Sequence, residues 1–273
     1  MRVILTTLFF LVNFGVFAQQ VAPINLVGTS KQSSISIRPE VTLFSHHHFF
    51  GSEVGEFNIH PKPGISIGYS KRYLLSKRLG LELGVFGGVI RFSYTAIAPK
   101  ENFTFRTYTA ELSESLVNPF LSIPILLNFQ HPLGNKYLLT LFGGTNFKAH
   151  FMEEISSGLR FSNAPGEFPK GDVFDVDLVF RNKPINTGII LGAGIGRMLP
   201  NHNILQLSLW ATLGLSNQME GGYVFYKQEY DSDGEEVLNI PAGAGLIESK
   251  GSSVGLELRY TLTGIRKRLK EIQ

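Results

Sequence analysis

Residues 205–215 read LQLSLWATLGL, and every second side chain of this stretch is apolar. The side chains of a β-strand point alternately to its two faces, whereas a helix would scatter these leucines around its circumference. The stretch therefore predicts a strand, with Trp210 on the face opposite the leucines. The apolar face comprises Leu205, Leu207, Leu209, Ala211, Leu213 and Leu215, and the other face comprises Gln206, Ser208, Trp210, Thr212 and Gly214.

The same alternation recurs along the chain, most clearly at residues 253–262, SVGLELRYTL. Six further segments show it with decreasing regularity. Within residues 81–94 the phase of the alternation slips near Gly87-Gly88, which predicts a β-bulge at that point. The six further predicted strands are residues 34–43, 64–73, 81–94, 120–129, 137–147 and 185–197.

The connections between these strands alternate between short and long. Outer-membrane barrels have short periplasmic turns, long extracellular loops and both termini on the periplasmic side. Strands of about ten residues also suit a tilted crossing of the bilayer. We therefore predict an all-β fold, an eight-stranded antiparallel up-and-down transmembrane barrel over residues 33–263. The predicted long loops are residues 44–63, 95–119, 148–184 and 216–252.

A soluble barrel or jelly roll is the alternative to a membrane barrel. Its apolar faces would point inward, and its other faces would be charged and hydrated. In this sequence the non-apolar faces are rich in Gly, Ser, Thr and Asn. Small residues suit the interior of a narrow barrel, where eight strands leave room only for side chains. This composition favours the membrane barrel.

The first eighteen residues resemble an export signal. Arg2 precedes an apolar run from Val3 to Val16, and Val16-Phe17-Ala18 offers a cleavage site before Gln19. The alternative is an N-terminal anchor that stays attached. After the signal, no run of 18 apolar residues remains that could form a spanning helix. We expect an exported protein of the outer membrane, with residues 19–32 as a periplasmic segment and 264–273 as a basic periplasmic tail.

The composition excludes several classes of function. The chain has no cysteine, which removes disulfides, thiolate metal sites, lipid attachment to cysteine and a cysteine nucleophile. The formal charge of +3 falls to +2 without Arg2. We find no basic stripe interleaved with aromatic residues, so nucleic acid is not an expected partner.

Six charged residues fall on the predicted interior faces, three of each sign. Because barrel closure sets the last strand beside the first, Glu257 and Arg259 should neighbour Arg38 and Glu40. Charges in a low-dielectric interior must be paired and hydrogen-bonded. We predict a structural salt-bridge plug, with a gate or proton path as the alternative. The six residues are Arg38, Glu40, Arg72, Glu82, Glu257 and Arg259.

Two motifs are candidates for a metal site. His46-His47-His48 could bind zinc or nickel, but successive side chains of an extended segment point apart, and no acidic or cysteine partner lies at ligand spacing. Residues 231–236, DSDGEE, resemble part of a calcium loop but lack its full ligand pattern, since position 12 is Ala242. We interpret them as a hairpin turn joining residues 223–230 to 236–240. We expect no metal or cofactor.

An enzyme acting on lipid A would need a serine, a histidine and an acid near the outer leaflet. His150 lies close in sequence to Glu153, Glu154, Ser156 and Ser157. Loops naturally collect polar residues, and no motif with fixed spacing is present. We therefore expect no catalytic site.

Three segments resemble strands of the PorT-like outer-membrane β-barrel proteins of Bacteroidota. These are residues 121–129, LSIPILLNF, the glycine-rich residues 186–196, NTGIILGAGIG, and the closing residues 253–260, SVGLELRY. The resemblance implies an outer-membrane barrel, and some members of the family assist secretion. Such barrels usually end on an aromatic residue, whereas here a basic tail follows Thr263.

These observations predict a barrel with a structural or secretion- and assembly-accessory role and no open pore. Its long loops would act through outer-membrane or periplasmic protein partners, and outer-membrane lipid would surround the barrel. An enzyme acting on lipid A, or a ligand-binding or adhesion protein, is the alternative.

Overall fold

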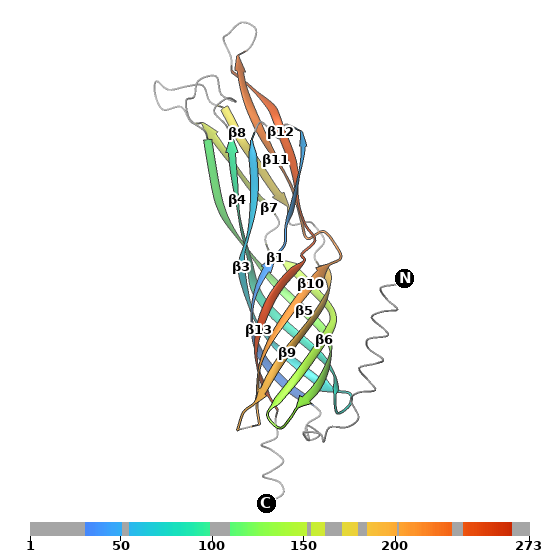
Figure 1. Cartoon of the computed structure of the whole chain (residues 1–273). Coiled ribbons are helices and arrows are strands. Elements are labelled where there is room, and N and C mark those ends of the chain that lie inside the picture. The colour runs from blue at the N-terminus through green and yellow to red at the C-terminus, as the bar shows by residue number, and fades with distance from the viewer. Residues whose placement is uncertain are drawn as a thin grey trace, which may run out of the picture.

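The computed structural model describes residues 31–50, 55–98, 110–151, 154–161, 171–179, 185–200, 202–230 and 237–263, whose regular elements are all strands (Figure 1). The predicted signal peptide, the segment before residue 31 and the basic tail lie outside these ranges, as does the predicted turn at 231–236. None of the described residues forms a helix long and apolar enough to cross a membrane.

Eight antiparallel strands form a closed barrel in the order β1-β13-β10-β9-β6-β5-β4-β3. Closure is made by β1, which pairs with both β3 and β13. Each of the eight predicted strands corresponds to one of these, in the predicted order, so the predicted fold class is confirmed. The strands are β1 (Lys31–Thr42), β3 (Glu56–Leu74), β4 (Leu79–Ala98), β5 (Ala110–Leu133), β6 (Tyr137–His150), β9 (Asn186–Met198), β10 (Ile204–Gly214) and β13 (Ser253–Leu262).

The barrel is apolar outside and largely polar inside. Along β10 burial alternates at every residue: Leu207 and Leu209 are 57% and 64% exposed, whereas Gln206 and Ser208 are 2% exposed. The exposed isoleucines, valines and leucines of the other barrel strands share the outward face. An apolar surface of this extent is incompatible with a water-solvated monomer. The outward face is therefore the lipid-contacting face, the reverse of a soluble barrel.

The predicted long loops are largely folded, which corrects the sequence-based expectation. Their described residues include a five-stranded antiparallel sheet in the order β2-β12-β11-β8-β7. The predicted hairpin of residues 223–230 with 236–240 is part of it, since Tyr230 pairs with Val237. The strands of this sheet are β2 (Ser45–Phe50), β7 (Glu154–Phe161), β8 (Gly171–Val179), β11 (Met219–Tyr230) and β12 (Val237–Ser249).

The other layer comes from the long strands β3, β4 and β5, which continue beyond the barrel (Figure 1). The β1–β3 ladder ends at Val41 and Pro63, and the β5–β6 ladder ends at Phe120 and His150. Beyond these points β3, β4 and β5 continue. The strands β2, β12, β11, β8 and β7 take the places of β1, β13, β10, β9 and β6, so the circular order of the barrel is kept. In the described residues, however, β2 does not pair with β3, nor β5 with β7. The barrel thus splits into two facing layers, which we call the distal sandwich.

The alternation along β4 continues without interruption through Gly87-Gly88, so the bulge predicted there is wrong. Every even-numbered residue from Gly80 to Ala98 is buried or half-buried. What changes near Gly87 is which face is apolar: Val85 points outward, whereas Ile90 is buried. Beyond this point the outward face of β4 no longer contacts lipid. Its inward face no longer lines the lumen and instead packs in the core of the sandwich. An irregularity does occur in the facing strand β3, between Lys62 and Ile65.

Candidate functional site

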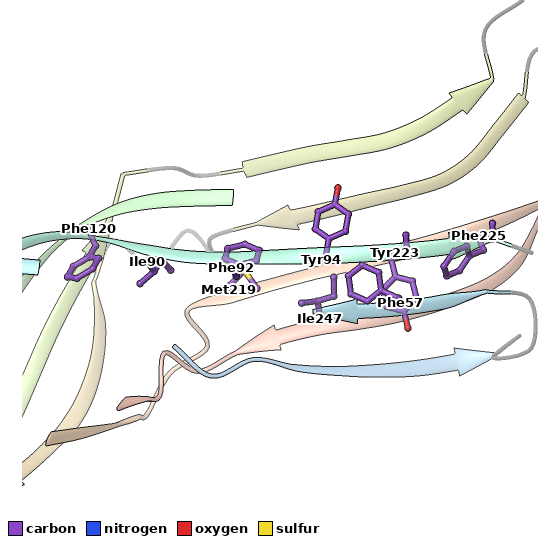
Figure 2. Packing of buried hydrophobic residues seen from close by; sticks show 11 residues of the cluster. Phe57, Ile90, Phe92, Tyr94, Phe120, Met219, Tyr223, Phe225 and Ile247 are labelled. Carbon is purple, nitrogen blue, oxygen red and sulfur yellow. The ribbon is translucent and has the colours of Figure 1, made fainter. Parts of the chain in front are cut away.

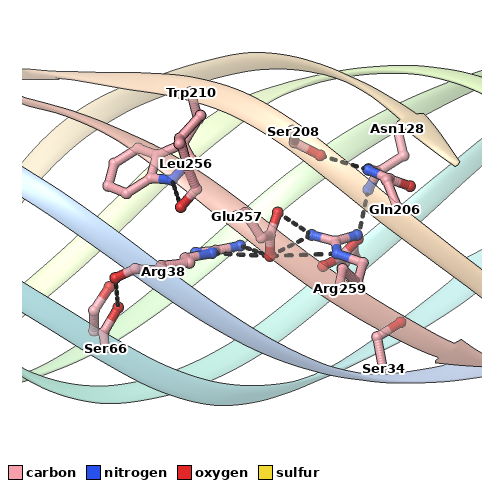
Figure 3. Close-up of polar contacts among 12 residues, drawn as sticks. Ser34, Arg38, Ser66, Asn128, Gln206, Ser208, Trp210, Leu256, Glu257 and Arg259 are labelled. Atoms are coloured by element: carbon pink, nitrogen blue, oxygen red, sulfur yellow. Dashed lines mark hydrogen bonds and ion pairs between the residues drawn. The ribbon is translucent and has the colours of Figure 1, made fainter.

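The six predicted interior charges all point into the barrel, where each is at most 4% exposed. Arg259 lies beside Glu257, and Arg38 lies on the other side of that carboxylate (Figure 3). Arg259 Nη1 lies 2.7 Å from Glu82 Oε2, and its Nη2 lies 3.1 Å from Glu257 Oε2. Arg38 Nη2 lies 2.9 Å from Glu257 Oε1. Cations and carboxylates therefore alternate across the lumen, from β1 through β13 to β4.

Arg72 joins this group through an amide rather than a carboxylate. Asn128 Nδ2 donates to Glu82 Oε2 at 3.0 Å, and Arg72 Nη2 donates to the main-chain oxygen of Asn128 at 3.4 Å. Asn128 thus links the β3 and β4 charges to β5. We call Arg38, Arg72, Glu82, Glu257 and Arg259 the lumen ion network.

Glu40 forms a separate ion pair higher in the lumen. Its Oε1 lies 3.4 Å from Lys148 Nζ, and Lys148 also lies 4.1 Å from the centroid of the Phe120 ring. The sequence interpretation missed Lys148 because it ended the strand at Phe147. The alternation along the strand could have identified it, since Lys148 lies an even number of residues from the interior residues Phe142 and Asn146 and so shares their face. In the register Glu40 lies opposite Gly255, two residues from Glu257 as predicted from barrel closure, but its ion pair is with Lys148.

Aromatic rings pack against the ion network. Arg38 Cζ lies 3.7 Å from the centroid of the Phe86 ring and 5.8 Å from that of Trp210. Trp210 is 5% exposed and faces the lumen, and its indole nitrogen donates to the Leu256 oxygen at 3.2 Å. Pro39 lies opposite Leu256 in the β1–β13 register and has no N–H to donate. The indole therefore supplies a donor at a point of the closing seam where proline has none.

Interior glycines on neighbouring strands make room for these rings. A Cβ on Gly192 would lie 2.3 Å from Phe142 Cζ, and a Cβ on Gly255 would lie 2.9 Å from Trp210 Cζ2. Phe142 and Trp210 pack with Leu126 and Ile190 in one buried cluster. Rings lying across glycines stabilise strand pairs in designed sheets in the same way. The middle of the lumen is thus occupied by an apolar layer beside an ion network.

The distal sandwich has an aromatic core of its own, shown in Figure 2. Phe57 of β3 stacks on Tyr223 of β11 with ring centroids 4.3 Å apart, and on Tyr94 with centroids 5.6 Å apart. Phe92 is fully buried and lies 4.8 Å from the ring of Phe44. Stacked and tilted rings at these distances contribute beyond their buried area. The two layers are therefore held by packing across the core, since the described residues show no strand pairing at the seams.

Burial in this core raises the pKa of the Tyr223 hydroxyl to about 12, from an ordinary value of about 10. The folded sandwich therefore favours the neutral phenol. We expect its contribution to stability to be complete below about pH 10 and to be lost as the pH rises towards 12. In Tyr223→Phe, unfolding followed over this range should show a weaker fall in stability than wild type. Parallel curves for the two proteins would contradict the assignment.

The other described candidates from sequence lie on different strands: the three histidines on β2, His150 at the end of β6, and Glu154, Ser156 and Ser157 on β7. His46, His47 and His48 lie in β2 opposite Ile247, Leu246 and Gly245. His150 ends β6, where its ring lies 6.1 Å from that of Phe120. Within the described residues, no group of three His, Asp or Glu side chains could hold a metal ion. Glu153 and residues 231–236 lie outside the described part.

These features define the class: a closed eight-stranded transmembrane β-barrel of the outer-membrane type, with a filled lumen and a folded distal sandwich. No family model and no curated protein matches the sequence. The structure is similar to the outer membrane protein OprG from Pseudomonas aeruginosa, at 12% identity and a TM-score of 0.45, covering 86% of this chain and 97% of that one.

Two further solved structures are similar over most of their length. Neisserial surface protein A, NspA, is 10% identical with a TM-score of 0.33, covering 84% of this chain and 97% of that one. The outer membrane protease OmpT from Escherichia coli is 10% identical with a TM-score of 0.34, covering 90% and 100%. At these values the fold assignment rests on the barrel geometry described above.

Proposed function

We propose that this protein is a non-conducting, non-enzymatic outer-membrane barrel that displays the distal sandwich to a protein partner, in a structural or secretion- and assembly-accessory role. The observation that carries the proposal is the folded state of the long connections. A core with eleven buried residues in the described part of the chain, including Phe57, Phe92 and Tyr223, packs between the two layers. Such a core makes a preorganised surface, which binds a partner with less ordering cost than loose loops would.

The orientation follows from the asymmetry of the barrel. Three short turns, near Ser76, Asn135 and Pro200, lie at the end where β1 begins and β13 finishes. In outer-membrane barrels this end faces the periplasm. We therefore propose that the distal sandwich lies outside the cell, as expected for an exported chain. The resemblance of three strands to the PorT-like family supports an accessory role in secretion.

Crosslinking followed by affinity purification tests the partner. The tagged full-length protein would be extracted with detergent from crosslinked outer membranes. We expect a stable outer-membrane protein, which can reach the distal sandwich from outside the cell, to co-purify. Phe92→Ala, which removes a core ring from the sandwich, should lose this partner while remaining in the membrane. Capture of no protein, or equal capture by the variant, would contradict display of a partner-binding sandwich.

Ion conductance across a planar bilayer tests the filled lumen. Wild type should show no steady openings, because rings and paired charges occupy the middle of the barrel. Trp210→Ala should increase conductance, since it removes the ring that covers Gly255 and lies near Arg38. Trp210→Phe keeps an aromatic ring and serves as the control. Steady single-channel openings by wild type would show that the lumen conducts.

A further inference from the structure

The barrel end with the short turns carries an arc of basic residues. Lys71 lies on β3, Lys77 and Arg78 in the β3–β4 turn, Lys136 in the β5–β6 turn and Arg197 on β9. We call these five residues the basic rim. Lys77, Lys136 and Arg197 are exposed, and Lys71 and Arg78 are half-buried. The strands β3 and β9 are four positions apart in the eight-stranded order, so the arc reaches opposite sides of the barrel.

The rim is not neutralised by carboxylates among the described residues. In the described part of this end the acidic residue is Glu82, which is 1% exposed inside the lumen and paired with Arg259. The opposite end has the reverse charge. The described residues of the four long connections, within 44–63, 95–119, 148–184 and 216–252, include 10 acidic and 5 basic residues. The charge is therefore strongly polarised along the barrel axis.

The rim lies where the apolar belt ends. Arg197 follows two residues after Ile195, which is 56% exposed, and Lys71 follows two residues after Tyr69, which is 51% exposed. Two residues of a strand span about 7 Å. Long basic side chains at such positions keep their stems against hydrocarbon and extend the charge to the headgroups. Lys71 Nζ also lies 6.0 Å from the ring of Tyr73, an aromatic residue typical of the interface.

We propose that the basic rim binds the headgroups of anionic phospholipids, such as phosphatidylglycerol, in the periplasmic leaflet. The inference rests on the orientation given under Proposed function. Lysine and arginine at an anionic lipid surface each strengthen binding, and the effect decays within a Debye length. A lipid is favoured over an acidic protein because the cations border the lipid-facing belt along half of the circumference, from β3 to β9.

The test uses the full-length protein reconstituted into phosphatidylcholine vesicles with or without phosphatidylglycerol, then extracted in mild detergent. Native mass spectrometry counts the lipids that stay bound. We expect preferential retention of phosphatidylglycerol that weakens with salt. The variant Lys71→Gln, Lys77→Gln, Lys136→Gln, Arg197→Gln should reduce that preference by on the order of tenfold or more. The matched control Lys62→Gln, Arg91→Gln, Lys227→Gln, Lys250→Gln removes four cations from the opposite end and should keep it.

The outcomes separate this inference from the proposed function. A barrel that inserts, as judged by heat-dependent mobility in dodecyl sulfate gels, but retains both lipids equally would overturn the lipid site alone. Failure to insert in either vesicle would overturn the membrane barrel and the lipid site together. Displacement of the lipid by inorganic phosphate at the same concentration would indicate a simple anion site and overturn the proposal. The proposal would also be overturned if the rim variant kept the lipid but lost an acidic protein partner.

Discussion

Arg259→Met is expected to lower the free energy of unfolding by about 3–5 kcal/mol, the cost of breaking a buried ion pair by removing one partner. Arg259 is 3% exposed and contacts Glu82 and Glu257, which are 1% and 0% exposed. Without the guanidinium, Glu82 retains only the Asn128 amide among its side-chain partners shown here, and Glu257 retains Arg38. Equilibrium unfolding by urea in lipid vesicles, read by gel mobility, measures the loss.

Arg91→Met is the matched control, because Arg91 is an exposed arginine on β4. Its effect should lie within about 0.5 kcal/mol. A second variant, Arg259→Met with Glu82→Gln, separates charge from packing. It should recover part of the loss, because one unpaired buried carboxylate has been neutralised. A loss below about 1 kcal/mol in Arg259→Met, or no recovery in the double variant, would contradict the ion network as described.

Phe92→Ala is expected to destabilise the distal sandwich by about 3–5 kcal/mol, the range for removing a buried aromatic ring. Phe92 is fully buried and packs on Phe44 in the core between the layers. The barrel below is held by continuous ladders around all eight strands, so it should stay folded. Limited proteolysis should therefore cleave the sandwich strands of the variant while the membrane barrel remains protected.

Phe151→Ala provides the comparison, since Phe151 is 64% exposed and its removal leaves no buried cavity. We expect proteolysis of this variant to match wild type. The two variants together measure whether sandwich and barrel unfold as separate units. If Phe92→Ala unfolded the barrel at the same urea concentration as the sandwich, the two parts would form one cooperative unit instead.

The barrel strands could be predicted because each has two faces in contrasting environments. Along β10 and β13, lipid requires apolar side chains on one face and a narrow lumen requires small or paired polar ones on the other, so the period of two is regular. The sandwich strands follow a different rule. In β11, Tyr223 and Phe225 are buried in the core, but the other face meets water and tolerates many residue types. Their alternation is correspondingly weaker, and the segment resembles a polar loop.

The lumen illustrates the same limit for the site. The alternation of inward and outward side chains along each strand identifies Arg38, Glu82 and Arg259 as lumen residues from sequence alone. It does not say which charge meets which, because Arg259 and Glu82 are 177 residues apart and come from strands that are not neighbours. The change of the apolar face near Gly87 is likewise visible in the sequence, but its cause, the passage from barrel to sandwich, is not.

By itself, the sequence determined the eight strands, their order, and which face of each points to lipid, since these depend on local periodicity and connection length. Only the tertiary structure decided the ion pairs, the rings lying over Gly192 and Gly255, and the packing of the connections into a second β-layer. The physical reason is the same in each case. Side-chain partners across a lumen or between layers are set by barrel closure and strand register, which bring together residues that no local pattern relates.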